Sequence, residues 1–452
     1  MHDLAIRGAT LVTARGRQRA HLYVDGGRIA AITAEGLSAR ESIDADGLVL
    51  LPGMVDGHAH FQDPGDTTRE DFRTGSAAAA AGGVTTVIEH THSQPVRDLA
   101  ALREKVAYLR GRSLIDFGLA AHAWPDRIVE VAPLWAAGVT FFKVFTCTTH
   151  GVPGFDHAML LGLFRELARV GALCLAHCED EAITAANERA LRAGGRTDPL
   201  VVRDWRTREA ELVAAGSVGL LARITGARVI VAHVSHAEVA DLLEREVAAG
   251  ARLALETCPQ YLYLREDELR AYSAFRKFTP PARIRFDADA DAMWRRVAQG
   301  PITHVSSDHA PATRAQKTEG SIWEAHFGLP GVETTLGLLL NGVAEGRLGL
   351  ERVVELVADA PARLYGLWPR KGSLEVGADA DIALVDLAAE RVLRDEDVVS
   401  KAGWTPYAGR RVRGRAVMTF SRGELVARDG RPIAEPGRGR FVPGPASPEA
   451  LR

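Results

Sequence analysis

The sequence is poor in cysteine and contains no long apolar run. Its 452 residues include only four cysteines, Cys147, Cys174, Cys178 and Cys258. This number is too small for a disulfide scaffold, so we expect reduced thiols and a cytoplasmic location. No run of about 18 residues lacks charges and glycine, and the chain begins without a basic, apolar signal segment. We therefore expect neither a membrane-spanning helix nor secretion.

The sequence also lacks an excess of charge of either sign. Against 55 Lys and Arg residues stand 58 Asp and Glu residues, a formal charge of -3, so nothing favours binding to nucleic acid or to an anionic membrane. Hydrophobic residues make up 46% of the chain and charged residues 25%, which is typical of a globular protein and excludes disorder. We expect a soluble protein with two or three domains and a small-molecule partner.

Eight apolar, strand-like runs with helical stretches between them occupy the middle of the chain. The runs are 48–55, 84–89, 117–121, 139–145, 172–176, 228–232, 252–255 and 302–306. Alternating strands and helices indicate repeated βα units with parallel strands, and eight such units form a (β/α)8 barrel of TIM type. The predicted fold class is therefore α/β, with the barrel at residues 52–370.

Short β-type runs occur at both ends of the chain. They fill residues 1–51, separated by glycines and charges, and they return after Pro369, for example at 381–386 and 416–420. Either end alone is too short to bury a core. We expect residues 1–51 and 371–452 to pair into one small composite β-sandwich, with an extended tail beyond Pro436.

Side chains that can bind metal ions stand at the ends of the barrel runs. His58 and His60 follow the first run at alternate positions, which places both imidazoles on one face of a strand. Four more occur in or after the fourth, fifth, sixth and eighth runs: Lys143, His177, His233 and Asp308. Because barrel active sites form at the carboxyl ends of the strands, we expect these six at one mouth. They suit a pair of divalent ions, Zn²⁺ ahead of Mn²⁺, Co²⁺ or Fe²⁺.

Lys143 is the unusual member of this set. It is flanked by phenylalanines on a central strand and has no route to water. Two cations would repel an ammonium, so the amine must be neutral or modified, and carboxylation by CO₂ would make it a bridging carboxylate. Two ions about 3.5–4 Å apart could hold a hydroxide and polarise a carbonyl, while Asp308 moves a proton from nucleophile to leaving nitrogen. The predicted reaction is hydrolysis.

These segments resemble the cyclic amidohydrolases, the group of the amidohydrolase superfamily that includes allantoinase, hydantoinase (dihydropyrimidinase) and dihydroorotase. The resemblance runs nearly end to end and includes Leu-Pro-Gly-Met-Val-Asp-Gly-His-Ala-His at 51–60. The other matching segments are 82–86, 176–179, 232–235, 307–311 and 377–381. The resemblance implies hydrolytic opening of a cyclic amide or ureide ring by a homo-oligomer, a tetramer or a dimer.

The resemblance also implies how the ligands are shared. His58, His60 and Asp308 would hold the more buried ion, and His177 and His233 the more exposed one. Carboxylated Lys143 would bridge both, and Asp308 would be the acid and base.

The substrate ring differs among the members of this group. Gln62 stands where a dihydroorotase usually has an arginine for the substrate carboxylate, which disfavours dihydroorotase activity. Thr148 stands where a hydantoinase usually has a tyrosine, and segment 145–148 looks more like allantoinase. An allantoinase, in turn, usually has a Met-Pro-Leu-Asn type segment where this chain carries His90 and His92. We expect substrate contacts from Gln62, His90, His92, Thr148 and the main chain of Thr279.

Three alternatives remain at the level of the sequence. One is that a hydrogen-bonded loop cluster, and not a substrate contact, is formed by His90, His92 and His122. A third metal ion is not expected, because the six-residue ligand set is already complete. A deaminase of the same fold would typically lack the bridging lysine. A non-catalytic scaffold such as the dihydropyrimidinase-related proteins would have lost metal ligands, and here all six positions are filled.

Overall fold

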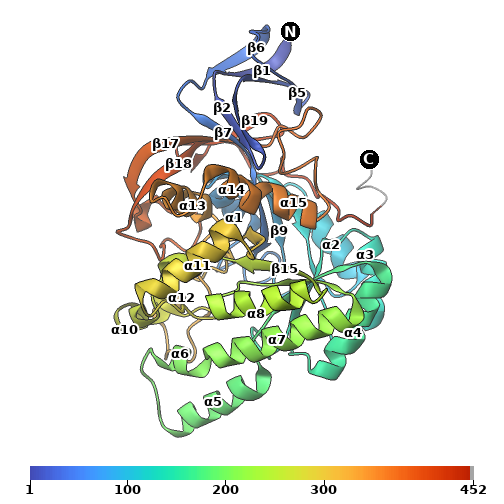
Figure 1. Cartoon of the computed structure of the whole chain (residues 1–452), viewed down its shortest axis with the longest axis vertical. Helices are drawn as coiled ribbons and strands as arrows, with labels where there is room; N and C mark the ends of the chain where they lie inside the picture. Colours follow the sequence, from blue (N-terminus) through green and yellow to red (C-terminus); the bar gives the residue numbers. More distant parts are fainter. Residues whose placement is uncertain (448–452) are drawn as a thin grey trace.

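The computed structural model describes residues 1–447, so the end of the expected tail, 448–452, lies outside the described residues. The α/β class is confirmed: helices surround parallel strands, and a separate group of strands lies at the top of Figure 1. All four cysteines are buried and free of disulfides. No helix in residues 1–447 combines the length and the hydrophobicity that crossing a membrane requires.

Two parallel sheets make up the interior of the α/β part. One has the strand order β10-β9-β8 and the other β11-β12-β13-β14-β15-β16. Their bounds are β8 (Met54–Ala59), β9 (Val84–Glu89), β10 (Asp116–Leu119), β11 (Ala121–His122), β12 (Phe142–Phe145), β13 (Leu173–His177), β14 (Arg228–Val231), β15 (Arg252–Thr257) and β16 (His304–Val305). Every residue of β8, β9, β12 and β13 is buried, as parallel strands covered on both faces require.

Hydrogen bonds cross between the two sheets on both sides. Thr140 N donates to Leu119 O at 2.9 Å, where the chain enters β12, and His60 N donates to His309 O at 2.7 Å, just beyond β8. The carboxyl ends of the outermost strands β8 and β16 therefore lie next to each other.

The helices lie outside these sheets and connect successive strands (Figure 1). Their bounds are α1 (Phe72–Ala81), α2 (Leu99–Leu109), α3 (Val131–Ala136), α4 (His157–Val170), α5 (Glu181–Ala193), α6 (Val201–Trp205), α7 (Arg208–Thr225), α8 (Ala237–Ala248), α9 (Gln260–Tyr263), α10 (Leu269–Tyr272), α11 (Asp287–Gln299), α12 (Arg314–Thr318), α13 (Thr335–Ala344), α14 (Leu350–Val354) and α15 (Ala360–Leu364).

Local signals set the limits of these helices, as α4 illustrates. Asp156 caps its start by accepting from Met159 N at 2.8 Å, and Gly171 ends it at φ 70°, a conformation that a side chain disfavours. Between these residues, Leu163 and Phe164 lie on the buried face.

The two chain ends supply the remaining strands. A four-stranded sheet has the order β5-β4-β1-β6, and a seven-stranded sheet the order β20-β19-β18-β17-β7-β2-β3. Their bounds are β1 (His2–Arg7), β2 (Thr10–Thr13), β3 (Gly16–Arg19), β4 (His21–Asp25), β5 (Arg28–Thr33), β6 (Ala39–Asp44), β7 (Val49–Pro52), β17 (Ile382–Val392), β18 (Arg411–Ser421), β19 (Glu424–Arg428) and β20 (Arg431–Pro432). Antiparallel pairing of β7 with β17 joins strands from opposite ends of the chain.

The expected strand at 48–55 is in fact two strands, β7 and β8, in different sheets. The break is at Gly53, whose N–H donates to Asp381 O at 2.9 Å. A Cβ on Gly53 would lie 2.2 Å from Thr85 Oγ1, so only glycine fits where the chain passes between the sheets. The residues next to Gly53 on both sides, Leu50 and Leu51 before it and Met54 and Val55 after it, are all buried and apolar, so hydrophobicity alone did not reveal the break.

A buried ion cluster ties the parallel strands to the composite sheet. Lys371 Nζ lies 2.5 Å from Asp116 Oδ2 on β10, 2.7 Å from Asp381 Oδ2 and 2.9 Å from Asp379 Oδ2. The lysine side chain is 0% exposed and the three aspartates at most 4%. One ammonium therefore holds together the carboxylates of two structural layers.

Replacing Lys371 by Met should lower the free energy of unfolding by about 3–5 kcal/mol, because it leaves the buried Asp381 without an ion-pair partner and leaves Asp116 and Asp379 with one arginine each. The matched control is Lys401→Met, whose Nζ lies 2.5 Å from Asp71 but whose side chain is 32% exposed. That variant should lose no more than about 1 kcal/mol. Urea unfolding of both variants tests this, and equal losses would contradict it.

Candidate metal centre

The six expected ligand residues line one cavity at the carboxyl ends of the parallel strands. The strands or the turns after them carry all six: His58 on β8, His60 after it, Lys143 on β12, His177 at the end of β13, His233 after β14 and Asp308 after β16. The cavity has a volume of about 20 Å³, also lined by Phe145, His150 and Phe327. Such a space suits small ions or water held directly by the surrounding side chains.

His58, His60 and Asp308 form one side of the cavity. Asp308 Oδ1 lies 3.2 Å from His58 Nε2 and 3.4 Å from His60 Nε2. The other ring nitrogens are engaged, because His58 Nδ1 lies 2.7 Å from Glu256 Oε1 and His60 Nδ1 2.6 Å from His90 O. A carboxylate or a carbonyl can only accept, so each Nδ1 carries the proton and each Nε2 keeps its lone pair toward Asp308.

His177 and His233 form the opposite side. His177 Nε2 donates to Glu179 Oε2 at 2.8 Å, and His177 Nδ1 lies 2.9 Å from His233 Nε2. Glu179 also accepts from Arg206 at 3.1 Å and from the Thr279 hydroxyl at 2.5 Å. A buried carboxylate with three donors thus fixes the His177 tautomer and leaves Nδ1 as the nitrogen with a free lone pair.

Burial determines the charge of these groups. It lowers the pKa of His60 to about 4 and that of His233 well below the usual value, so both imidazoles are neutral at pH 7. It also lowers the pKa of Lys143 to about 8, although Asp308 and Glu256 act in the opposite direction. Burial would raise the pKa of Glu179, but Arg206 and His177 hold it at about 2.

Lys143 lies where the two sides meet. Its Nζ is 3.4 Å from His58 Nε2 and 5.1 Å from the centre of the Phe145 ring, and it forms no ion pair with any carboxylate of residues 1–447. The side chain is buried, with 1% of the residue exposed. An amine in this position lacks the counter-ion that a buried ammonium needs.

The donor set fits divalent metal ions. Neutral imidazole nitrogens, a carboxylate oxygen and an unpaired amine converge in one cavity, and the ligand atoms of His58, His60 and His90 all lie within 4.8 Å of one another. Borderline divalent ions bind such mixed nitrogen and oxygen sets.

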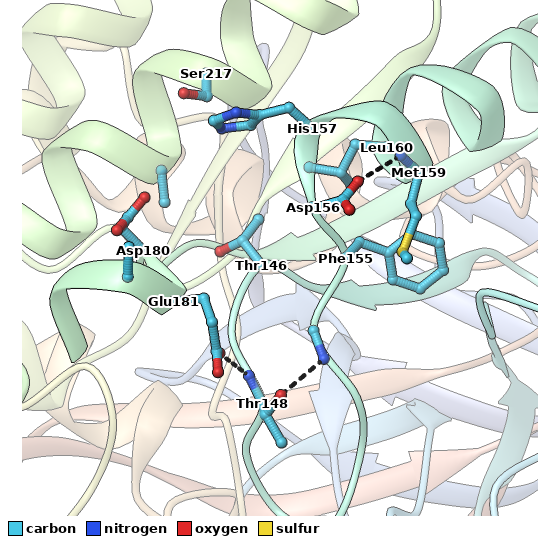
Figure 2. Close-up of a pocket in the computed structure, with 13 residues that line it drawn as sticks. Thr146, Thr148, Phe155, Asp156, His157, Met159, Leu160, Asp180, Glu181 and Ser217 are labelled. Carbon is cyan, nitrogen blue, oxygen red and sulfur yellow. Dashed lines mark hydrogen bonds between the residues drawn. The ribbon is translucent and has the colours of Figure 1, made fainter. Parts of the chain in front are cut away.

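The expected substrate residues are divided among different places. His92 and Thr279 line the metal cavity. Gln62 and His90 are buried but are not among the residues that line it. Thr148 lies in a separate pocket of about 310 Å³ (Figure 2), where its N–H donates to Glu181 Oε2 at 2.5 Å.

Sequence analysis did not identify the residues that support the histidines. Glu256 stands at the end of β15, the seventh barrel run, so the strand-end rule could have found it. Glu179 lies only two residues after His177, and its carboxylate accepts from the His177 ring. His150 stacks on His92 with ring centres 4.7 Å apart, but it reaches the cavity on a loop at φ 53°, which no spacing pattern indicates.

The chain is similar to known proteins over almost its whole length. Residues 49–426 match the model of the amidohydrolase family. The chain is 38% identical over 433 residues to an allantoinase of Solibacter usitatus, covering 94% of each protein. It is 33% identical to an L-hydantoinase of Paenarthrobacter aurescens, covering 98% of each. The solved L-hydantoinase (dihydropyrimidinase) of Arthrobacter aurescens matches with a TM-score of 0.94 at 32% identity, over 98% of this chain and 100% of that one. These matches confirm the resemblance seen in the sequence.

Replacing Glu256 by Gln should weaken metal binding by about 10–100-fold, because a neutral amide accepts a weaker hydrogen bond from His58 Nδ1 and can present its NH2 group instead. Equilibrium competition with a chelator, read out as metal content, measures the change. Glu181→Gln is the matched control, since Glu181 contacts Thr148 outside the cavity. Unchanged binding in Glu256→Gln would refute the orienting role.

Proposed function

Because the chain belongs to the amidohydrolase family, we propose that it is a metal-dependent hydrolase that opens a cyclic amide or ureide ring of the allantoin or hydantoin type. The observation that carries this proposal is the convergence of four histidines, Lys143 and Asp308 on one cavity. The relatives named allantoinase and L-hydantoinase, which align over nearly their full lengths, support the same chemistry.

We propose two Zn²⁺ ions as the cofactor, with Lys143 carboxylated by CO₂ as their shared ligand. His58, His60 and Asp308 would hold one ion, and His177 and His233 the other. When bound, the ions would polarise the ring carbonyl and acidify water. Carboxylation is supported by the position of the Lys143 amine, which is buried beside an imidazole and forms no ion pair with a carboxylate of the described residues. The new carboxylate would supply the missing negative charge.

Asp308 is proposed as the group that moves the proton. Its side chain is 13% exposed, compared with 1% for His58 and 3% for His60, so it alone of these three reaches toward open space. It would take the proton from the attacking water and give it to the ring nitrogen as the amide bond breaks. Thr279 and His92 would contact the ring, and Phe327 would help to exclude water.

The surrounding architecture completes the proposal. We propose that the two parallel sheets are arcs of one (β/α)8 barrel, residues 52–370, since hydrogen bonds link them on both sides. Residues 1–51 and 371–452 would form the composite β-sandwich. We further propose that the protein is cytoplasmic and forms a homo-oligomer, a tetramer or a dimer. Thr148 would contact the exocyclic part of the substrate.

The proposed function predicts ring opening as a gain of one water, detected by mass spectrometry. Zinc-loaded protein offered allantoin, hydantoin, dihydrouracil, dihydroorotate and a cyclic imide should open at least one. Asp308→Asn should reduce the turnover of that ring by about 100–10,000-fold, since the proton carrier is lost. Activity retained in Asp308→Asn would refute the assigned role.

Carboxylation of Lys143 predicts a carbamate signal in carbon-13 NMR after the protein is loaded with labelled bicarbonate and zinc. Lys143→Arg should lack the signal, because a guanidinium, always protonated, does not react with CO₂. Lys277→Arg is a suitable control, since Lys277 is buried but donates to main-chain carbonyls away from the ligands. An identical signal in Lys143→Arg would place the modification elsewhere.

A further inference from the structure

We propose that His90 is a third imidazole ligand of the ion held by His58 and His60. This inference rests on the proposed metal-dependent function and adds to it a residue that the six-residue set does not contain. It assigns to His90 a role different from the substrate contact that the sequence suggested.

The geometry places His90 beside the two histidines. The ligand atoms of all three lie within 4.8 Å of one another. Ring centres are 4.8 Å apart for His58 and His90 and 4.4 Å apart for His60 and His90. Three imidazoles around one point are a donor arrangement that zinc sites commonly use.

The backbone fixes His90 in this position. It follows β9 directly, and its N–H donates to Ala59 O at 3.1 Å, which ties it to β8. Its carbonyl accepts from His60 Nδ1 at 2.6 Å. His90 therefore sets the tautomer of His60 through its main chain while its own ring lies against that of His60.

The His90 ring itself has no other role among the described residues. The residue is 1% exposed, and neither Nδ1 nor Nε2 has a hydrogen-bond partner within residues 1–447. Its neighbours on the far side are the Phe141 ring, at 5.4 Å between centres, and the His122 ring, at 6.1 Å. A buried polar ring needs a partner, and an ion bound at His58 and His60 would provide one.

The alternative role, direct contact with substrate, suits His92 better than His90. His92 and His150 line the cavity, and their rings stack with centres 4.7 Å apart and planes at 19°. The His90 ring instead lies directly beside those of His58 and His60, the residues with which it would share the ion. His90 would thus bind the ion, and His92 would contact the substrate.

A third imidazole would make this ion site richer in nitrogen. Nitrogen donors favour zinc and cobalt, whereas manganese and magnesium prefer oxygen donors. We therefore expect the ion at His58, His60 and His90 to dissociate more slowly than the ion at His177 and His233, and to discriminate against manganese.

The test compares His90→Asn with His92→Asn, each as the full chain loaded with zinc or cobalt. Competition with a chelator measures the affinity of each ion, and the visible spectrum of bound cobalt reports the number of nitrogen ligands. His90→Asn should bind one of two ions at least about 10-fold more weakly and change the cobalt spectrum. His92→Asn should retain both affinities and the spectrum.

Two results would overturn the inference. One is wild-type affinity and spectrum in His90→Asn, and the other is equal loss of metal in both variants. His90→Gln and circular dichroism of the metal-free proteins separate loss of a ligand from loss of the fold. If wild-type protein itself binds no ion, the proposed function fails. If it binds two ions and His90→Asn does the same, only the role of His90 fails.

Discussion

The constraint on which the structure depends is the burial of several imidazole and amine side chains, away from water, at one place. Four imidazoles and one amine are 1–2% exposed at the ends of strands that are themselves buried. Such groups stay buried at acceptable free energy only if they are neutral or meet an ion. Burial makes His60 and His233 neutral, and the Lys143 amine forms no ion pair with a carboxylate of residues 1–447. The fold thus creates a site that ions would complete.

Much of the surrounding structure holds these side chains in their orientations. Glu256 on β15 and Glu179 just after β13 each fix one imidazole by accepting from the nitrogen that points away from the cavity. Arg206 keeps Glu179 ionised by compensating its burial. At the other end of β10, Lys371 connects the parallel strands to the sheet formed by both chain ends. The rigid framework is what allows so many polar groups to remain close together.

The sequence was sufficient to predict the α/β class and the meeting of the six donors, because parallel strand ends share one edge. The sequence did not reveal the break at Gly53, since the buried apolar residues on both sides of this glycine form one continuous run. His150 was missed because a loop with φ 53° brings it into the cavity, and loop geometry has no periodic signal. Thr148, expected as a substrate contact, lies in a separate pocket of about 310 Å³ and does not line the metal cavity. Glu256 could have been found, because it ends the seventh run.

The central claim is that the cavity holds two ions bridged by carboxylated Lys143. The most direct measurement is anomalous diffraction at the zinc edge, from crystals grown with zinc and bicarbonate. The account predicts two zinc peaks, one beside His58 and His60 and one beside His177 and His233. Electron density should continue from Lys143 Nζ into a carboxylate between the two peaks. A cavity without zinc, or a free Lys143 amine beside bound zinc, would contradict it.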